Sequence, residues 1–161
     1  MLSDDLTQSS KSSYLRQSMN QGYAEILNNP LVSAQLKQAW EDSKPGVTGG
    51  HEEGGFILKD SVGNLSVVRW SLGNQNSIVL PSHPKCKIGE GAIVASFHTH
   101  PNTGGDYLQE PSETDKRAVR DDPDLKGAFY VGEFVISQAK IYLIAPNGQV
   151  SEISDTSIIL G

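Results

Sequence analysis

The spacing of hydrophobic residues changes near Gly50. Before this point, apolar residues recur at steps of three and four over residues 14–27, which is the spacing of one helix face. That helix is expected to end before Pro30, and a looser pattern over residues 31–40 predicts a second helix. We therefore predict an N-terminal helical extension over residues 1–45.

After Gly50 the pattern becomes one of short apolar runs typical of β-strands. Polar turn sequences at 61–64, 137–139 and 146–148 favour hairpins, and hence an antiparallel or mixed sheet. We predict that residues 46–161 form one α/β (α+β) domain, with a mainly antiparallel sheet flanked by helices. The predicted strands are Gly55 to Lys59, Leu65 to Leu72, Ser77 to Leu80, Ala92 to His98, Ala128 to Ile136, Lys140 to Ala145 and Gln149 to Ile153.

Composition and charge exclude several classes of function. A chain of 161 residues with 37% hydrophobic residues is long enough to bury a core. Its net charge of -6, without a Lys/Arg-rich run, argues against a nucleic-acid partner. Residues 1–13 are polar and no apolar run approaches about 18 residues, so we expect neither a signal peptide nor a membrane span. The single Cys86 excludes an internal disulfide. We expect a cytoplasmic protein, and export without a signal peptide stays open.

Two histidines at the end of a predicted strand are the first sign of a metal site. If residues 92–98 form a strand, His98 and His100 leave it on the same face. Asp115, on a polar segment predicted to begin a helix near Ser112, could supply an oxygen, although a helix dipole also favours an acid there. Two imidazoles, a carboxylate and an open position describe a catalytic zinc site.

A zinc site of this kind also needs a carboxylate that can move a proton beside the metal. Glu52 and Glu53 stand just before a predicted strand and would project in opposite directions, so only one can face the metal. Spacing alone does not choose between them. The neighbouring His51 either orients Glu52 or lies exposed in a loop.

Three short motifs follow one another along the chain: Glu52-x-x-Gly55, His98-x-His100-Pro101 and Ser112-x-x-Asp115. Together they resemble the JAMM motif of the JAB/MPN metalloprotease superfamily. The resemblance implies the fold of that family, a cytidine-deaminase-like sandwich.

The resemblance implies a role for each polar position. His98, His100 and Asp115 would bind one Zn²⁺ per chain, and Glu52 would act as the general acid/base. Ser112 would help to stabilise the tetrahedral intermediate, although its place also suits a helix N-cap, and both roles can hold. The implied reaction is hydrolysis of a peptide or isopeptide bond in a protein or peptide substrate, such as the tail of a ubiquitin-like or other small protein.

The segment between Pro101 and Pro111 is longer than in the common form of the motif. It either grips the substrate through Tyr107 and Leu108 or is a tolerated surface excursion, since closing a longer loop costs little. A similar long loop occurs in bacterial JAB-like domains, including some attached to polymorphic toxins, so the resemblance is to bacterial members.

Several other interpretations follow from the sequence. A catalytically silent MPN-like binding or scaffold module and a secreted effector or toxin domain are the alternatives to a cellular peptidase. Residues 1–45 are a candidate pro-segment over the cleft. A metal or nucleophile role for the pair His83 and Cys86 is discounted, because no third group orients it. The aromatic residues expected in the core are Trp70, Phe97, Phe129, Tyr130, Phe134 and Tyr142.

Overall fold

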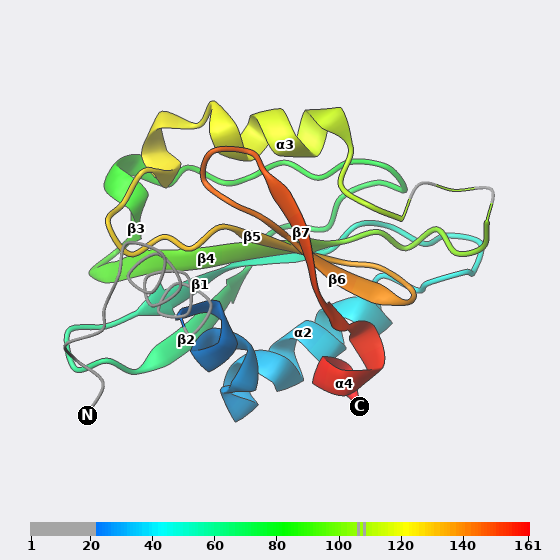
Figure 1. Ribbon diagram of the computed structural model, residues 1–161, viewed down its shortest axis with the longest axis horizontal. Helices are drawn as coiled ribbons and strands as arrows, with labels where there is room; N and C mark the ends of the chain where they lie inside the picture. Colours follow the sequence, from blue (N-terminus) through cyan, green and yellow to red (C-terminus); the bar gives the residue numbers. More distant parts are fainter. Residues whose placement is uncertain (1–21, 106, 108) are drawn as a thin grey trace, which may run out of the picture.

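A mixed β-sheet forms the centre of the molecule in the computed structural model (Figure 1), which describes residues 22–161 except 106 and 108. Across these residues the sheet has seven strands, in the order β2-β1-β4-β5-β6-β7, with β3 pairing with β4 beside this path. The strands are β1 (Gly54–Lys59), β2 (Leu65–Arg69), β3 (Lys87–Ile88), β4 (Gly91–Thr99), β5 (Glu133–Ile136), β6 (Lys140–Ile144) and β7 (Val150–Asp155).

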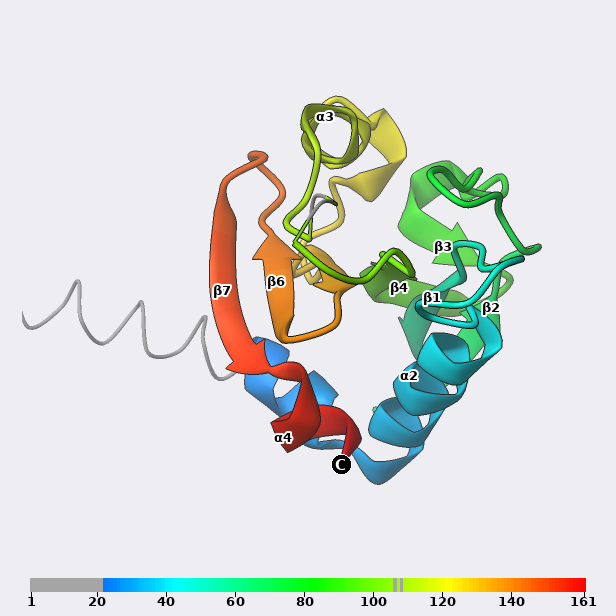
Figure 2. The ribbon, with the colours of Figure 1, turned by 90° about the vertical axis from the view of Figure 1, so that its right-hand side faces the viewer.

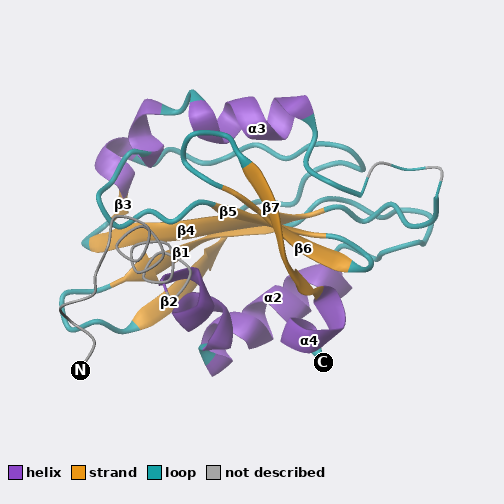
Figure 3. Ribbon diagram, viewed as in Figure 1, coloured by secondary structure: helices purple, strands orange, loops and turns teal. Residues whose placement is uncertain are grey.

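One parallel pair of strands sets the position of the candidate site. β4 and β5 run parallel, whereas the other paired strands run antiparallel. A parallel pair needs a crossover, and here it contains the loop after β4, helix α3 (Glu113–Arg120) and the 3-10 helix η3 (Pro123–Leu125). The end of β4 and the start of α3 are thereby brought to one edge of the sheet (Figure 3).

The helices lie on opposite faces of the sheet. α3 covers one face, whereas α2 (Pro30–Asp42) and α4 (Thr156–Leu160) lie against the other (Figures 1 and 2). Residues 22–28 are also helical, and η2 (Pro84–Cys86) is a second 3-10 helix. None of the helices in the described part of the chain is long and apolar enough to cross a membrane.

Two apolar clusters fill the space between the sheet and these helices. Phe97 and Phe134 are register partners in β4 and β5 and belong to the cluster that includes Leu36 of α2. The other cluster contains Val135 of β5 and Val119 of α3. Because strand residues alternate between faces, the residue after Phe97 faces α3. This residue is His98.

Helix α2, which precedes β1 in the chain, is part of the core. Asn29 caps α2 by accepting hydrogen bonds from the amides of Leu31 and Val32, and Pro30 occupies the first turn. Val32 and Leu36 are fully buried against the sheet. Since α2 lies on the face away from α3, it does not cover the candidate site, and residues 1–21 of the predicted extension lie outside the described residues.

The coarse prediction of a mixed α/β fold with a mostly antiparallel sheet is confirmed. The second predicted helix and the three hairpin turns are confirmed as well, since the turns join β1 to β2, β5 to β6 and β6 to β7. The short strand β3 and helix α4 were not predicted, because their sequences of two and five residues are too short to show a period.

Three strand predictions are wrong in part or in full. The strand predicted over 65–72 ends at Arg69. Residues 77–80 form no strand, because Asn74 accepts hydrogen bonds from the amides of Asn76 and Ser77 and closes a turn there. The strand predicted over 128–136 begins only at Glu133, after Gly132 with its positive φ of 131°. Phe129 was expected in the core but is 76% exposed, because it lies before the strand.

Gly55 lets β1 pack closely between its neighbours. A Cβ at this position would lie 2.8 Å from the backbone oxygen of Val68 and 2.8 Å from Cε1 of Phe97. We expect Gly55→Ala to lower the free energy of unfolding by about 1–3 kcal/mol, because the added methyl group overpacks the core. Urea denaturation measures this change. Gly105→Ala, where no atom lies within 4 Å of the new Cβ, is the control. An unchanged urea midpoint for Gly55→Ala would contradict this packing.

Candidate metal centre

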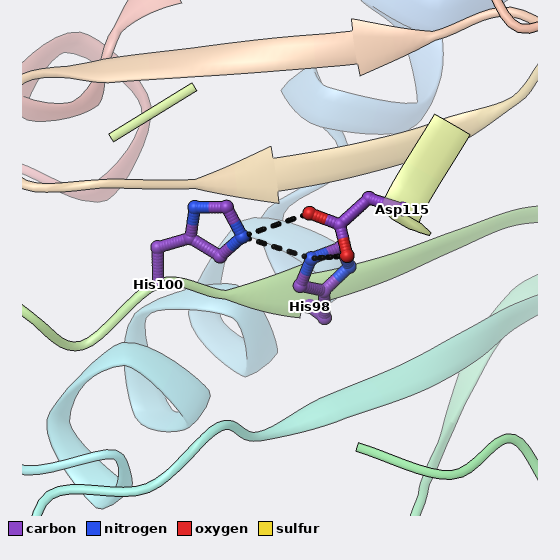
Figure 4. A group of neighbouring side chains, drawn as sticks. All are labelled: His98, His100 and Asp115. Carbon is purple, nitrogen blue, oxygen red and sulfur yellow. Dashed lines mark hydrogen bonds and ion pairs between the residues drawn. The ribbon is translucent and has the colours of Figure 1, made fainter. Parts of the chain in front are cut away.

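Two imidazole rings from the end of β4 face each other. His98 is the next-to-last residue of β4 and His100 follows the strand, and both side chains are buried. The two Nε2 atoms are 3.3 Å apart (Figure 4). The predicted spacing of two residues therefore brings both rings to the same spot.

The third member of the group comes from the first turn of α3. Asp115 Oδ2 lies 3.1 Å from Nε2 of His100, and Oδ1 lies 3.5 Å from Nε2 of His98. The same carboxylate accepts a hydrogen bond from the amide of Ser112, while the Ser112 hydroxyl accepts one from the amide of Asp115. This reciprocal capping box begins the helix and fixes the carboxylate. Helix capping and contact with the histidines are thus compatible in Asp115.

Each histidine uses its other ring nitrogen to contact an acceptor. Nδ1 of His98 lies 2.6 Å from Oε2 of Glu133, and Nδ1 of His100 lies 3.1 Å from the backbone oxygen of Gln109. A carbonyl oxygen and an ionised carboxylate can only accept, so each Nδ1 carries the hydrogen. Both Nε2 atoms point toward the carboxylate of Asp115, where a proton or a metal ion can lie between the nitrogen and the oxygen.

Two ring nitrogens and a carboxylate that converge in this way are the arrangement of a cation site. The ligand atoms of His98, His100 and Asp115 lie within 4.8 Å of one another. The group can hold a metal ion, and the chemistry of its donors fits one: two neutral imidazoles and a carboxylate.

The charges around the group stabilise its ionic form. Burial lowers the pKa of His98, but the carboxylates of Glu133 and Asp115 outweigh burial and raise that pKa well above its ordinary value. Burial raises the pKa of Asp115, but hydrogen bonds from His100 and His98 outweigh burial and lower that pKa below its ordinary value. The Asp115 carboxyl is therefore ionised at neutral pH, as a metal ligand must be.

Glu133 was not identified from the sequence. It begins β5, is buried, and is the register partner of Ser96 in β4. Its second oxygen accepts a hydrogen bond from the hydroxyl of Ser96 at 2.8 Å, and this hydroxyl is also 2.7 Å from the hydroxyl of Tyr130. Its signal in the sequence is an acidic residue next to the apolar residues Phe134 to Ile136, where a charge is costly without a partner.

Glu133→Gln is expected to weaken metal binding, because the neutral amide no longer holds the Nδ1 hydrogen of His98 as strongly. Losing a carboxylate behind a ligand histidine typically costs about 10–100-fold in metal affinity. Competition of the purified protein with a chelator for Zn²⁺ measures this, with Glu152→Gln at an exposed position of β7 as the control. Equal affinities of Glu133→Gln and wild type would show that Glu133 does not support the ligand.

Of the two candidate bases, Glu52 is the one that lies beside the candidate metal site. Its side chain is buried and lines a cavity of about 210 Å³ together with His100, Ser112 and Asp115. Its amide donates to the backbone oxygen of Asn74, and its own backbone oxygen accepts from Gly73. These two bonds hold Glu52 in place beside the cavity.

Glu53 points to a different set of partners. Its carboxylate contacts Arg69 of β2 and the ring of His51. Its backbone amide donates to the hydroxyl of Thr99, the residue between the two ligand histidines, and its backbone oxygen accepts from the amide of Thr99. The alternation expected at this point is therefore present, and His51 pairs with Glu53 instead of orienting Glu52.

Burial shifts the pKa of Glu52 toward neutrality. It raises the pKa of Glu52 from 4.5 to about 7, although the nearby imidazoles of His98 and His100 act to lower that pKa. Asp115 and Glu133 raise it further by charge repulsion. A carboxyl with a pKa near neutrality can both accept and return a proton at physiological pH.

This shift should be visible in the stability of the metal-free protein. Because the pKa of Glu52 is about 7 in the folded state and 4.5 in the unfolded state, the folded state binds more protons between these pH values. The free energy of unfolding contributed by Glu52 therefore falls as pH rises from 4.5 to 7 and stays low above. Glu52→Gln should remove this loss, which is up to about 3 kcal/mol at pH 8.

Urea denaturation of chelator-treated protein at pH 4.5 and pH 8 measures the effect. Glu90→Gln, at an exposed turn, is the control. If Glu52→Gln and wild type showed the same difference in stability between the two pH values, Glu52 would not be buried as an unpaired acid.

The loop between β4 and α3 forms part of the cavity wall. Asn102 and Tyr107 of this loop line the cavity, as do Gln75 and Asn76 from the turn before η2. Tyr107 is 50% exposed, so part of its ring remains open to solvent at the mouth. Of the two contacts predicted for the loop, Tyr107 lies at the cavity and Leu108 lies outside the described residues.

The remaining histidine and the cysteine lie away from this cavity. Nε2 of His83 is 2.6 Å from Oδ2 of Asp122, and Nδ1 is 2.6 Å from the backbone oxygen of Pro81. Cys86 is buried in the apolar cluster beneath α3. His83 contacts the segment after α3 through Asp122, and Cys86 of η2 shares an apolar cluster with Leu125 of η3.

Comparison of the chain with protein-family models, with curated protein sequences and with solved structures found no match.

Proposed function

We propose that this chain is a zinc-dependent peptidase or isopeptidase of the JAMM type, with the fold of the JAB/MPN superfamily. The observation that carries the proposal is the convergence of two Nε2 atoms and one carboxylate, next to a buried glutamate that lines the adjoining cavity. The order of the motifs in the sequence supports it independently.

Zinc fits the donor set better than the other common metals. Two imidazoles and a carboxylate are the ligands of catalytic zinc sites, which keep a fourth position open. Two nitrogens at about 2.0–2.1 Å from a tetrahedral ion lie about 3.3 Å apart, and the two Nε2 atoms are 3.3 Å apart. His98, His100 and Asp115 would hold the ion.

When bound, the zinc ion would lower the pKa of a water molecule and polarise the carbonyl of the scissile amide. Glu52 would take a proton from the water as its oxygen adds to the carbonyl carbon. It would then deliver this proton to the amine nitrogen as the carbon–nitrogen bond breaks, so that one water yields one acid and one amine. A pKa near 7 for Glu52 suits both transfers.

Ser112 would act on the oxygen of the substrate carbonyl. Its hydroxyl already accepts a hydrogen bond from the amide of Asp115, which leaves the hydroxyl hydrogen to donate. The capping box holds this hydroxyl at the wall of the cavity. A donor fixed in this way can stabilise negative charge that develops on the carbonyl oxygen.

The substrate would be a protein or peptide segment that enters the cavity beside Tyr107. To identify it, zinc-loaded wild type and Glu52→Gln would each be incubated with a bacterial proteome. New N-termini found only with wild type would indicate peptide cleavage, and newly freed lysine side chains would indicate isopeptide cleavage. The absence of any difference between the two samples would instead indicate a binding module without turnover.

A further inference from the structure

The side chain of Gln109 closes the loop that lines the cavity. Its Nε2 atom lies 3.0 Å from the backbone oxygen of Asn102, 3.2 Å from that of Gly104 and 3.3 Å from that of Tyr107. Three carbonyl oxygens can only accept, so the amide nitrogen, with its two hydrogens, must face them. One side chain thereby ties together the beginning, the middle and the cavity-facing part of the loop.

The backbone of the same residue contacts a candidate metal ligand. The carbonyl oxygen of Gln109 is the acceptor 3.1 Å from Nδ1 of His100. Among the residues that the structure describes, no carboxylate lies behind Nδ1 of His100 as Glu133 does for His98. The orientation of the His100 ring therefore depends on where the loop places one peptide carbonyl.

We propose that Gln109 is a positioning residue, which couples the loop that carries Tyr107 to the metal ligand His100. This inference rests on the proposed metal site, and it adds a connection between the cavity wall and the ligand. The side chain of Gln109 holds the loop closed, and the closed loop holds the carbonyl against Nδ1. A contact that moves Tyr107 is transmitted to His100 through this residue.

Other contacts anchor the loop without reaching the ligand. Gly104 donates its amide hydrogen to the side-chain oxygen of Gln138 at 3.0 Å. The Asn102 side chain bonds those of Gln75 and Asn76 at 2.8 and 2.9 Å. Gln138, in the turn between β5 and β6, therefore offers a matched control, because it is also a glutamine bonded to this loop but has no bond to His100.

Gln109→Ala, Gln109→Glu and Gln138→Ala would be compared with wild type. The glutamate is similar in shape, but as an ion it cannot donate to the three carbonyl oxygens, so it tests the hydrogen bonds and not the volume. Zn²⁺ affinity would be measured by chelator competition, and the visible spectrum of the Co²⁺-loaded protein would report the geometry of the ligands. The exchange of the loop amides with deuterium would report whether the loop is closed.

Both Gln109 variants are expected to speed amide exchange in the loop, to lower Zn²⁺ affinity about tenfold or more, and to shift the Co²⁺ spectrum. Gln138→Ala is expected to change exchange near Gly104 while leaving Zn²⁺ affinity within about twofold of wild type. The inference would be overturned if a Gln109 variant kept the wild-type affinity and spectrum. It would also be overturned if Gln138→Ala lowered Zn²⁺ affinity as much as the Gln109 variants do, since the order of the loop alone would then explain the loss of affinity.

A measurement on the metal-free protein separates this inference from the proposed function. Nitrogen NMR of the imidazole rings identifies which nitrogen of His100 carries the hydrogen. Wild type should show it on Nδ1, and Gln109→Ala should show a mixture of both tautomers. If wild type bound no zinc but showed this change, the proposed function would fail while the coupling would hold. If wild type bound zinc but the tautomer of His100 did not respond to Gln109→Ala, the coupling would fail while the proposed metal site would hold.

Discussion

His100→Ala is expected to abolish tight zinc binding. Structural zinc sites with four protein ligands hold the ion with about 10–16 kcal/mol, and the proposed site has three. Loss of one of the three should therefore weaken binding about a hundredfold or more, and cleavage should disappear with the metal. The alanine also leaves the Asp115 carboxylate without its contact at 3.1 Å. Zinc content after dialysis and chelator competition measure the effect.

His83→Ala is the matched control for this experiment, because His83 also pairs with a carboxylate but lies outside the cavity. It should bind zinc like wild type. If His100→Ala retained wild-type affinity, or if both variants lost zinc equally, His100 would not be a ligand.

Glu52→Gln is expected to retain zinc and lose catalysis. Glutamine matches the shape of the buried side chain but cannot take a proton from water, and general acid/base groups contribute about 10²–10⁴ to a rate. The rate of cleavage of a substrate found in the proteome experiment should fall by this factor, with zinc content unchanged. Removing a buried acid should not weaken the metal site, because Glu52 is outside the ligand group.

Glu53→Gln provides the comparison at the neighbouring residue. Its side chain contacts Arg69 and His51, so the substitution can reduce stability but should preserve the rate of the folded enzyme. If Glu53→Gln lost activity while Glu52→Gln kept it, the assignment of the base would be reversed.

Much of the candidate site could be predicted from the sequence, because local rules place it. A strand alternates its side chains, which puts His98 and His100 on one face, and a helix start explains the place of Asp115. Alternation fixes only that Glu52 and Glu53 diverge, and the choice of Glu52 as the expected base came from the family resemblance. The structure places Glu52 at the cavity and Glu53 against Arg69 of β2.

The supporting residues could not be predicted from the sequence, for two physical reasons. Glu133 lies 35 residues after His98 and reaches it only through the register of the parallel pair β4 and β5. Gln109 contacts His100 through a backbone carbonyl, which any residue type possesses. In the fold, the apolar pattern of residues 77–80 predicted a strand that does not form. The side chain of Asn74 instead accepts hydrogen bonds from the amides of Asn76 and Ser77 and stabilises a turn there.

The proposed metal ligands can be tested in one experiment, X-ray absorption of the wild-type chain after incubation with zinc. We expect one zinc ion per chain, with nitrogen and oxygen ligands at about 2.0–2.1 Å and the scattering signature of two imidazole rings. A chain that takes up no zinc would contradict the proposed metal centre. So would a sulfur ligand at about 2.3 Å, which could come only from a residue outside the group of His98, His100 and Asp115.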